Sequence, residues 1–413
     1  MIKYEEFILD NGLQIIVHED HTLPIAVLNI LYNVGSRDEE EHKTGFAHLF
    51  EHLMFGGSAN IKSFDEPLQK VGGENNAFTN TDITNYYISL PAINIETAFW
   101  LESDRMLKLS FEEKVLEVQR QVVIEEYKER YLNQPYGDVW LNLRPLAYKV
   151  HPYRWPTIGK DISHIETATM EDVKSFFSKF YIPNNAIMVV AGDVILENIR
   201  KLSEKWFGPI PAGSNYSRQL PVEPVQTATQ RSKKNADVPL DAIYIAFHMS
   251  GRNNEAYHTI DLLSDILGRG KTSRLYQELV KGKNIFNSID AYLTGSIDPG
   301  LLVISGKIKN GVSPDDAEAE IYAIIEKTLK YGISSHELQK VKNQAYTSLA
   351  FQEVELLNRA MNLAFFTSIG DPGLINEEQE KIRAVTQESV MNAAEQIFSI
   401  KNMNILHYQR INS

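Results

Sequence analysis

The sequence contains no cysteine among its 413 residues. Disulfide bonds, thiolate metal ligands and a cysteine nucleophile are therefore excluded. Basic residues are outnumbered, with 41 Lys and Arg against 54 Asp and Glu and a net charge of −13. Because phosphate neutralisation needs sizeable basic patches, this balance argues against a nucleic-acid-binding protein. No apolar run approaches the length of a membrane span, so no transmembrane helix is expected.

The first residues do not have the pattern of a secretory leader. They lead directly into a strand-like segment at 13–17, with no charged n-region and apolar h-region before it. We therefore expect a cytoplasmic protein, although a periplasmic enzyme whose leader was removed would have the same sequence. The chain is 43% hydrophobic and 23% charged, and its length suits two well-buried domains rather than a single core.

The most informative feature of the sequence is His-Leu-Phe-Glu-His at residues 48–52. Positions i, i+3 and i+4 of a helix share one face, so His48, Glu51 and His52 would project in one direction. Two imidazoles one turn apart suit Zn²⁺, and the carboxylate beside them can take a proton from water that zinc activates. The order H-x-x-E-H is the inverzincin motif. The alternative is an amphipathic helix with two solvent-facing histidines.

A catalytic zinc site needs a third protein ligand and an open position for water. Residues 115–130 contain no Gly or Pro and predict a helix, in which Glu126 falls in line with the valines at 115, 118, 122 and 123. A carboxylate on an apolar face usually neutralises or finds a cation, so Glu126 is preferred as the ligand over its neighbour Glu125. An ordinary buried salt bridge to Lys or Arg is the alternative.

These motifs resemble those of the M16 (pitrilysin-type) zinc peptidases, in particular the shorter subfamily that includes the mitochondrial processing peptidase and many bacterial peptidases. The resemblance runs over nearly the whole chain and rests on residues 48–58, 72–79, 119–126 and 151–159. It implies that His48, His52 and Glu126 bind one zinc ion and that Glu51 is the general base.

The resemblance also implies the fold and the substrate. It implies an α+β fold of two homologous domains, each with a mainly antiparallel sheet covered by helices, which face each other across a closed chamber. Asn76 and Ala77 would belong to an edge strand that binds the substrate as an added strand. The expected function is that of a zinc-dependent endopeptidase that hydrolyses peptides or unfolded polypeptide segments.

Composition divides the chain into two halves. From 208 to about 234 the sequence turns to Pro, Gly, Ser, Asn, Gln and Lys, which is typical of a linker. Residues 245–252 weakly repeat residues 30–37, but nothing in the second half of the chain repeats the metal motif. We expect a zinc-binding domain at 1–212, a linker at 213–234, and a second domain without a metal site at 235–413.

Two positions depart from the family pattern. Active members of the family, or their partner subunits, carry an Arg and, seven residues later, a Tyr in the second half, where this chain has Val280 and Asn287. The resemblance therefore implies a heterodimer, in which an M16-like chain that lacks H-x-x-E-H supplies the Arg and Tyr. Gln119 replaces a Glu that many relatives have. We expect zinc binding to survive this change, while it puts catalytic efficiency in question.

Three other interpretations of the sequence are less well supported. A non-catalytic scaffold or peptide-binding subunit is disfavoured by the intact ligand set, and a structural α/β protein would make the histidine-rich helix incidental. Residues 268–273, Gly-Arg-Gly-Lys-Thr-Ser, end like a phosphate-binding loop, but Asp265 stands where that loop requires Gly. This stretch is therefore predicted to be a helix stop at Gly268 and a tight turn at Gly270.

Overall fold

A computed structural model of the chain describes residues 1–411, which form two units. The first unit comprises residues 1–128, 155–220 and 350–377. The second comprises residues 129–154, 221–349 and 378 onward. This division differs from the contiguous domains expected from the sequence, because each unit contains a segment taken from the other half of the chain.

The first unit is built on a six-stranded sheet with the strand order β1-β2-β6-β3-β5-β4. Only β2 and β6 pair in parallel, and the other neighbours are antiparallel. The mainly antiparallel sheet expected from the sequence is thus confirmed for this unit, and β4 forms one open edge. The strands are β1 (Glu5–Ile8), β2 (Gln14–Glu19), β3 (Ile25–Tyr32), β4 (Glu74–Thr79), β5 (Thr84–Pro91) and β6 (Ala186–Gly192).

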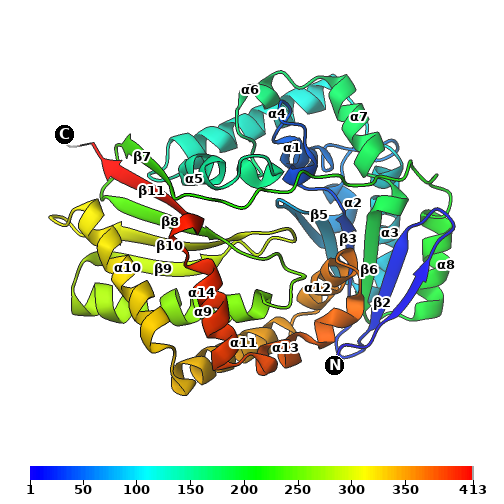
Figure 1. Cartoon of the computed structure of the whole chain (residues 1–413). Helices are drawn as coiled ribbons and strands as arrows, with labels where there is room; N and C mark the ends of the chain where they lie inside the picture. Colours follow the sequence, from blue (N-terminus) through cyan, green and yellow to red (C-terminus); the bar gives the residue numbers. More distant parts are fainter. Residues whose placement is uncertain (412–413) are drawn as a thin grey trace. The chain divides into compact units, whose positions relative to one another are not determined.

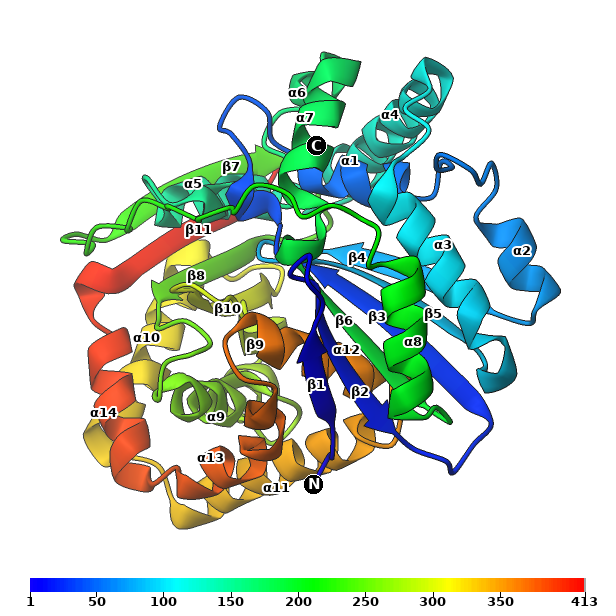
Figure 2. The same ribbon diagram turned by 90° about the vertical axis from the view of Figure 1, so that its right-hand side faces the viewer.

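Helices cover this sheet on both faces. Figure 2 shows α3 and α8 on one face and α12 on the other. The remaining helices of the unit include α1 and α4, which pack against each other. The helices are α1 (Phe46–Leu53), α2 (Asp65–Lys70), α3 (Ile95–Leu107), α4 (Glu113–Tyr127), α6 (Ser163–Glu166), α7 (Met170–Phe180), α8 (Leu196–Trp206) and α12 (Leu356–Ser368).

Helix α12 comes late in the chain and still belongs to the first unit. It contacts β6, β3 and β2, and its residues Ala360, Leu363 and Ala364 are fully buried. At its beginning Arg359 forms an ion pair of 2.7 Å with Asp20 and donates a hydrogen bond of 2.9 Å to Nε2 of His18. Burial of this apolar face explains why residues 350–377 belong to the first unit and not to the domain expected at 235–413.

The second unit is built on a five-stranded sheet with the order β7-β11-β8-β10-β9. Only β7 and β11 are parallel. Its strands are β7 (Gln230–Ala236), β8 (Ala242–His248), β9 (Phe286–Leu293), β10 (Leu301–Ile308) and β11 (Met403–Arg410). Its helices are α5 (Val139–Ala147), α9 (Tyr257–Gly268), α10 (Pro314–Tyr331), α11 (Ser335–Gln352), α13 (Glu378–Ala384) and α14 (Gln387–Ile397). In Figure 1 α9, α10 and α14 lie on one side of this sheet and α5 on the other.

Strand β7 lies inside the segment expected to be a linker at 213–234. Its sequence, Gln-Arg-Ser-Lys-Lys-Asn-Ala, has almost no apolar side chains, so no strand pattern was visible. It forms because its backbone pairs in parallel with β11 at the edge of the sheet, where polar side chains face solvent. The irregular segment therefore ends at 229.

Local expectations agree closely with the observed elements. Residues 25–32, whose sequence predicts a strand, form β3, and residues 94–108, whose sequence predicts a helix, contain α3. Helix α9 ends at Gly268, and Gly270 has a φ of +75°, as expected for a helix stop followed by a tight turn. These predictions succeed because helix and strand periodicity are local properties of the chain.

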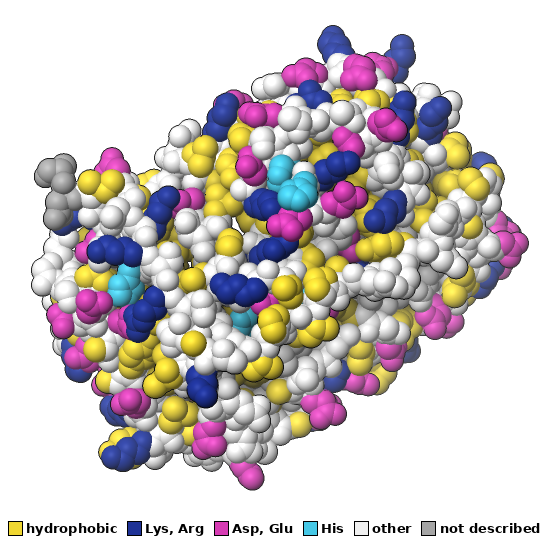
Figure 3. Space-filling view, turned by 45° about the horizontal axis from the view of Figure 1, so that its top comes forward, with side chains coloured by type: hydrophobic (Ala, Val, Ile, Leu, Met, Phe, Trp, Pro, Cys, Tyr) yellow, Lys and Arg dark blue, Asp and Glu magenta, His cyan; other side chains and the backbone are white. Residues whose placement is uncertain are grey.

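The surface carries charges of both signs. Figure 3 shows Lys and Arg side chains interspersed with Asp and Glu on the face in view, without a continuous basic area. Within residues 1–411 no helix is both long enough and apolar enough to cross a membrane.

Candidate active site

Helix α1 carries His48, Glu51 and His52, and its first turn is held by a buried carboxylate. Glu39 accepts hydrogen bonds from the backbone N–H of Gly45 (2.9 Å) and of Ala47 (2.8 Å). These donors have no partner inside the helix, so Glu39 caps it. The other face of α1, with Phe46, Leu49, Phe50 and Leu53, is buried. The helix is therefore anchored at its start and along one side.

Gly45 allows the chain to enter α1 at a sharp angle. Its φ is +89°, in the left-handed region that glycine adopts without strain. A Cβ atom at this position would lie 2.6 Å from the carbonyl oxygen of Ile158. Both observations require glycine here, so the orientation of α1 depends on this residue.

Glu126 lies in the last turn of α4. The structure does not confirm the buried valine stripe that the sequence predicted beside it. Val118 and Val122 are 50% and 44% exposed, so the valines do not form a buried stripe. The buried line of the helix is Leu116, Val123 and Tyr127. Glu126 lies beside this line with 17% of its side chain exposed, half-buried and still accessible.

The neighbouring carboxylate faces elsewhere. Glu125 Oε1 accepts a hydrogen bond of 2.8 Å from Lys128, and 68% of the Glu125 side chain is exposed. The preference for Glu126 over Glu125 is thus consistent with the observed positions. Directly after α4 the chain continues in a wider π-helical turn, Lys128–Leu132.

The two helices bring three donor atoms together. Oε2 of Glu126 lies 3.6 Å from Nε2 of His48 and 3.5 Å from Nε2 of His52. The ligand atoms of these three residues all lie within 4.8 Å of one another. Donors bound to Zn²⁺ at about 2.0–2.1 Å in a tetrahedral arrangement are about 3.3–3.4 Å apart. The observed spacing, and a set of two imidazoles and one carboxylate, therefore fit zinc.

Glu51 projects from the same helix toward β4. Burial raises the pKa of its carboxyl group, and the nearby Glu126 adds to this, whereas Thr79 and the His52 ring act in the opposite direction. A carboxyl group with a raised pKa beside a metal site is suited to proton transfer near neutral pH. Glu51 therefore lies beside the candidate metal site and is not one of its three clustered donor residues.

Strand β4 forms the open edge beside Glu51. The backbone N–H of Ala77 donates a hydrogen bond of 2.8 Å to the side-chain oxygen of Asn76 and not to β5. The backbone N–H and C=O groups of successive residues face opposite edges of a strand, so those of Asn75, Ala77 and Thr79 face the open edge. Asn76 and Ala77 therefore stand where the sequence predicted an edge strand.

Sequence reasoning missed a group of buried residues beneath α1. The Tyr86 hydroxyl lies 3.4 Å from the Phe50 carbonyl oxygen, to which it donates, and 3.2 Å from the Tyr181 hydroxyl. The Arg105 guanidinium lies 4.5 Å from the Tyr86 ring centre and is paired with the fully buried Glu102. The opposite charges of Glu102 and Arg105, spaced i, i+3 in α3, were the available signal.

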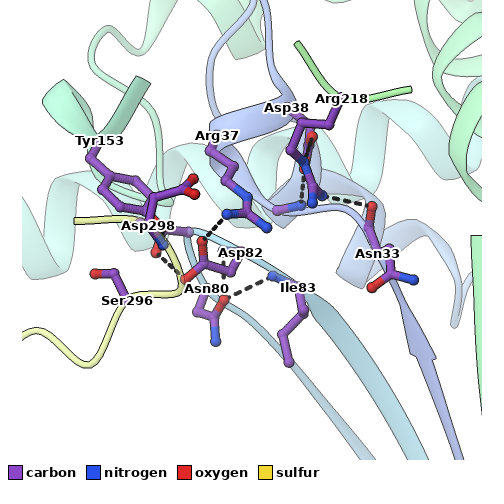
Figure 4. A network of polar contacts seen from close by, with 12 residues as sticks. Asn33, Arg37, Asp38, Asn80, Asp82, Ile83, Tyr153, Arg218, Ser296 and Asp298 are labelled. Carbon is purple, nitrogen blue, oxygen red and sulfur yellow. Dashed lines mark hydrogen bonds and ion pairs between the residues drawn. The ribbon is translucent and has the colours of Figure 1, made fainter. Parts of the chain in front are cut away.

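The loop between β3 and α1 is held by two ion pairs. Figure 4 shows Arg37 pointing toward Asp82, at 3.0 Å, and Arg218 pointing toward Asp38. Arg218 donates from Nε and Nη2 to Asp38 at 2.6 and 2.9 Å. Because Arg218 belongs to the irregular segment that precedes β7, this segment is fastened to the loop that leads into α1.

The second unit lacks an equivalent set of ligands in its matching helix. Residues Ile260, Leu263, Ser264 and Leu267 of α9 are buried. One other group of possible ligands occurs in the described chain, formed by Asp315, Glu318 and His407. There Arg231 binds the Glu318 carboxylate through two hydrogen bonds of 2.8 and 2.6 Å. A guanidinium in this position neutralises the carboxylate, so this group is a polar network.

The positions expected to hold an Arg and a Tyr are also in the second unit. Val280 lies in the π-helical segment Tyr276–Gly282 and packs against the core. Asn287 is exposed near the start of β9, where its amide lies 3.5 Å from the carbonyl oxygen of Ile308. Neither residue supplies a guanidinium or a phenol.

Known proteins resemble this chain over most of its length. The family model described as Insulinase (Peptidase family M16) matches residues 14–159, and that described as Peptidase M16 inactive domain matches residues 167–345. The zinc protease PqqE of Helicobacter pylori is 32% identical over 82% of this chain and 78% of its own length. The uncharacterized zinc protease YmxG of Bacillus subtilis is 25% identical over 97% and 96%.

Solved structures agree with the sequence comparisons. The crystal structure of a protease from Helicobacter pylori superposes with a TM-score of 0.92 and 28% identity, covering 99% of this chain and 100% of its own. The identity and coverage of PqqE exceed what chance resemblance between unrelated folds produces, and both halves of the chain match models of the same family. The chain therefore belongs to the M16 peptidase family.

Proposed function

We propose that this protein is a zinc-dependent endopeptidase in which His48, His52 and Glu126 hold one zinc ion. The observation that carries the proposal is the convergence of three donor atoms from two helices. Oε2 of Glu126 in α4 lies 3.6 Å from Nε2 of His48 and 3.5 Å from Nε2 of His52, both in α1. Several relatives of this chain are named zinc proteases, which supports the same metal.

The chain's own residues would move the proton during hydrolysis. A zinc ion at this site would acidify water and polarise a peptide carbonyl group. Glu51 accepts the proton at its carboxylate and then passes it to the leaving amine. Because burial raises the pKa of Glu51, the protonated form that serves as the acid is easier to reach than for an exposed carboxylate.

The open edge of β4 suggests how a substrate binds. An extended peptide that pairs with β4 would take the N–H of Ala77 as a donor and displace the side chain of Asn76 from it. The peptide would then pass Thr79, against which the Glu51 carboxyl group lies. Backbone pairing gives affinity with little choice of sequence. The substrates would therefore be peptides and unfolded polypeptide segments.

We also propose that the chain works in a heterodimer. Val280 and Asn287 leave the second unit without the guanidinium and phenol of the family pattern. The partner would be an M16-like chain that lacks H-x-x-E-H and supplies these two groups. Full peptidase activity of the purified chain, as a monomer or homodimer, would contradict this part of the proposal.

The test of the activity is the Glu51→Gln variant. With zinc and a fluorogenic peptide, and with the candidate partner present, we expect a loss of turnover of about 10²–10⁴-fold. Zinc content should stay at one ion per chain, because Glu51 is not a ligand. The matched control is Glu125→Gln, which changes the exposed carboxylate that directly precedes Glu126 in α4. Retained activity of Glu51→Gln would refute the assignment.

The same assay separates catalysis from a scaffold role. A wild-type chain that binds zinc and peptide but never hydrolyses the peptide, alone or with its partner, would be a non-catalytic peptide-binding subunit. Absence of zinc from the wild-type chain would instead leave the histidine-rich helix as an incidental feature.

A further inference from the structure

A lysine on the sheet of the second unit is surrounded by tyrosines. Lys307 lies near the end of β10, opposite Ser288 of β9 and Ala242 of β8. Its Nζ atom donates a hydrogen bond of 2.8 Å to the Tyr244 hydroxyl and lies 2.8 Å from the centre of the Tyr136 ring. Tyr136 is itself fixed by a hydrogen bond from its hydroxyl to the carbonyl oxygen of Leu240, at 2.8 Å.

No carboxylate in the described part of the chain neutralises this ammonium group. Among residues 1–411 none lies within ion-pair distance of Lys307. Asp290 of β9 is on the same face of the sheet, opposite Ser305, and it too forms no ion pair in the described chain. Burial lowers the pKa of Lys307 to about 8, and burial raises the pKa of Asp290. At neutral pH Lys307 is still mostly an ammonium ion.

A half-buried cation without a counter-charge is costly unless something compensates it. The Tyr136 ring compensates part of this cost, because a cation over an aromatic face is attracted to it. The Tyr244 oxygen takes one of the three N–H donors of the ammonium group, and two remain. These donors, beside the exposed side chains of edge strand β9, suit an oxygen ligand that carries negative charge.

We propose that Lys307, held in place by Tyr136 and Tyr244, binds a carboxylate of a peptide ligand. That the ligand is a peptide rests on the proposed function; that it is a carboxylate rests on the geometry around Lys307. Both a C-terminal carboxylate and an acidic side chain offer this chemistry. A lysine that only packs against tyrosine rings would show no preference between a carboxylate and an amide.

Binding can be measured without hydrolysis, so that the test does not depend on peptidase activity. The full-length Glu51→Gln chain would be titrated, with fluorescence anisotropy as the readout, into three labelled peptides of one sequence. One ends in a free carboxylate and has no acidic side chain. The second ends in an amide, and the third ends in an amide and carries one internal Glu. We expect at least one acidic peptide to bind about tenfold more tightly than the uncharged one.

The variants assign this preference to Lys307. Lys307→Met should abolish the preference for the acidic peptide and leave affinity for the uncharged peptide unchanged. Lys307→Arg keeps a cation and should restore much of the preference. Lys309→Met, which removes a lysine just beyond β10, is the matched control and should behave like the parent chain. A thermal melt of each variant would show whether it is folded.

The two ways of failing are distinguishable. Equal affinity for acidic and uncharged peptides, or a preference that persists in Lys307→Met, overturns the carboxylate site whether or not the wild-type chain cleaves peptides. Failure of the wild-type chain to hydrolyse any peptide, with the preference intact and lost in Lys307→Met, overturns the peptidase function and keeps the carboxylate site.

Discussion

Oε2 of Glu126 lies 3.5 Å from Nε2 of His52, although the two residues belong to different helices. The same oxygen lies 3.6 Å from His48. Replacing Glu126 by Gln should therefore remove an anionic ligand and weaken zinc binding more than about tenfold, since loss of groups outside the ligand set alone costs 10–100-fold. Competition with a zinc-sensitive chelator would measure this change.

The matched control for this substitution is Glu125→Gln. Glu125 precedes Glu126 in α4 but pairs with Lys128 at the surface. Its replacement should leave zinc affinity unchanged. Equal zinc affinity in Glu126→Gln and in the parent chain would show that the third ligand lies elsewhere.

Gly45→Ala should disturb the start of α1. At a φ of +89° an alanine is strained by about 1 kcal/mol, and its Cβ would also meet the Ile158 carbonyl oxygen. Gly311 offers a control with the same φ of +89° and no heavy atom within 4 Å of a Cβ. Urea denaturation should show a smaller loss for Gly311→Ala than for Gly45→Ala, and only the latter should lower zinc affinity. Equal losses would indicate that the close approach to Ile158 is unimportant.

Ala77→Pro tests whether substrates pair with β4. The Ala77 N–H faces the open edge, so its removal costs no bond of the sheet, and proline is tolerated at edges. We expect the KM for a peptide to rise about tenfold with a small effect on thermal stability. In Phe78→Pro the lost N–H faces β5, so this control should destabilise the protein. An unchanged KM in Ala77→Pro would argue against strand addition at this edge.

His18 makes the contact between α12 and the first sheet sensitive to pH. Its Nδ1 donates a hydrogen bond of 2.6 Å to the Lys3 carbonyl oxygen, and its Nε2 accepts one from Arg359, so the ring is neutral. Burial lowers its pKa in the folded state. The unfolded chain, with a pKa of about 6.5, then binds more protons, and the free energy of unfolding falls as the pH falls below that value.

Urea midpoints at several pH values would test this dependence. The glutamine in His18→Gln can form hydrogen bonds but does not titrate. The free energy of unfolding of this variant should therefore fall less than that of the wild type as the pH is lowered. His21 is the control with the opposite sign, because a hydrogen bond to Asp193 raises its pKa. Its contribution is present at low pH and is lost as the pH rises, so His21→Gln should not reduce the sensitivity to acid. An identical acid slope in His18→Gln and wild type would count against the role of His18.

Parts of the candidate site were predictable because they depend on helix geometry. The spacing of His48, Glu51 and His52 places them together on α1 whatever surrounds the helix. Glu126 does lie beside His48 and His52, but the predicted valine stripe that pointed to it is not buried. Periodicity indicates that a helix has an apolar stripe, but it cannot tell that Val118 and Val122 remain half-exposed while Leu116 and Tyr127 are buried.

The exchange of segments between the two units was not predictable from local patterns. Helix α12 is amphipathic wherever it packs, and only contact with β6 and β3 assigns it to the first unit. Strand β7 has no apolar alternation and exists because β11 offers it a backbone partner. Both outcomes depend on contacts between segments that are distant in sequence. Patterns within a short stretch of sequence cannot reveal such contacts.

The sequence by itself predicted that His48, Glu51 and His52 share one face of a helix, and it predicted the type of several helices and strands, because these follow from the order of neighbouring residues. Only the tertiary structure decided that Glu126 reaches His48 and His52, that Ala77 turns its N–H to an open edge, and that Lys307 stands among tyrosines with no carboxylate of residues 1–411 within ion-pair distance. These relationships are set by the packing of separate elements, where burial and chain entropy balance over the whole fold.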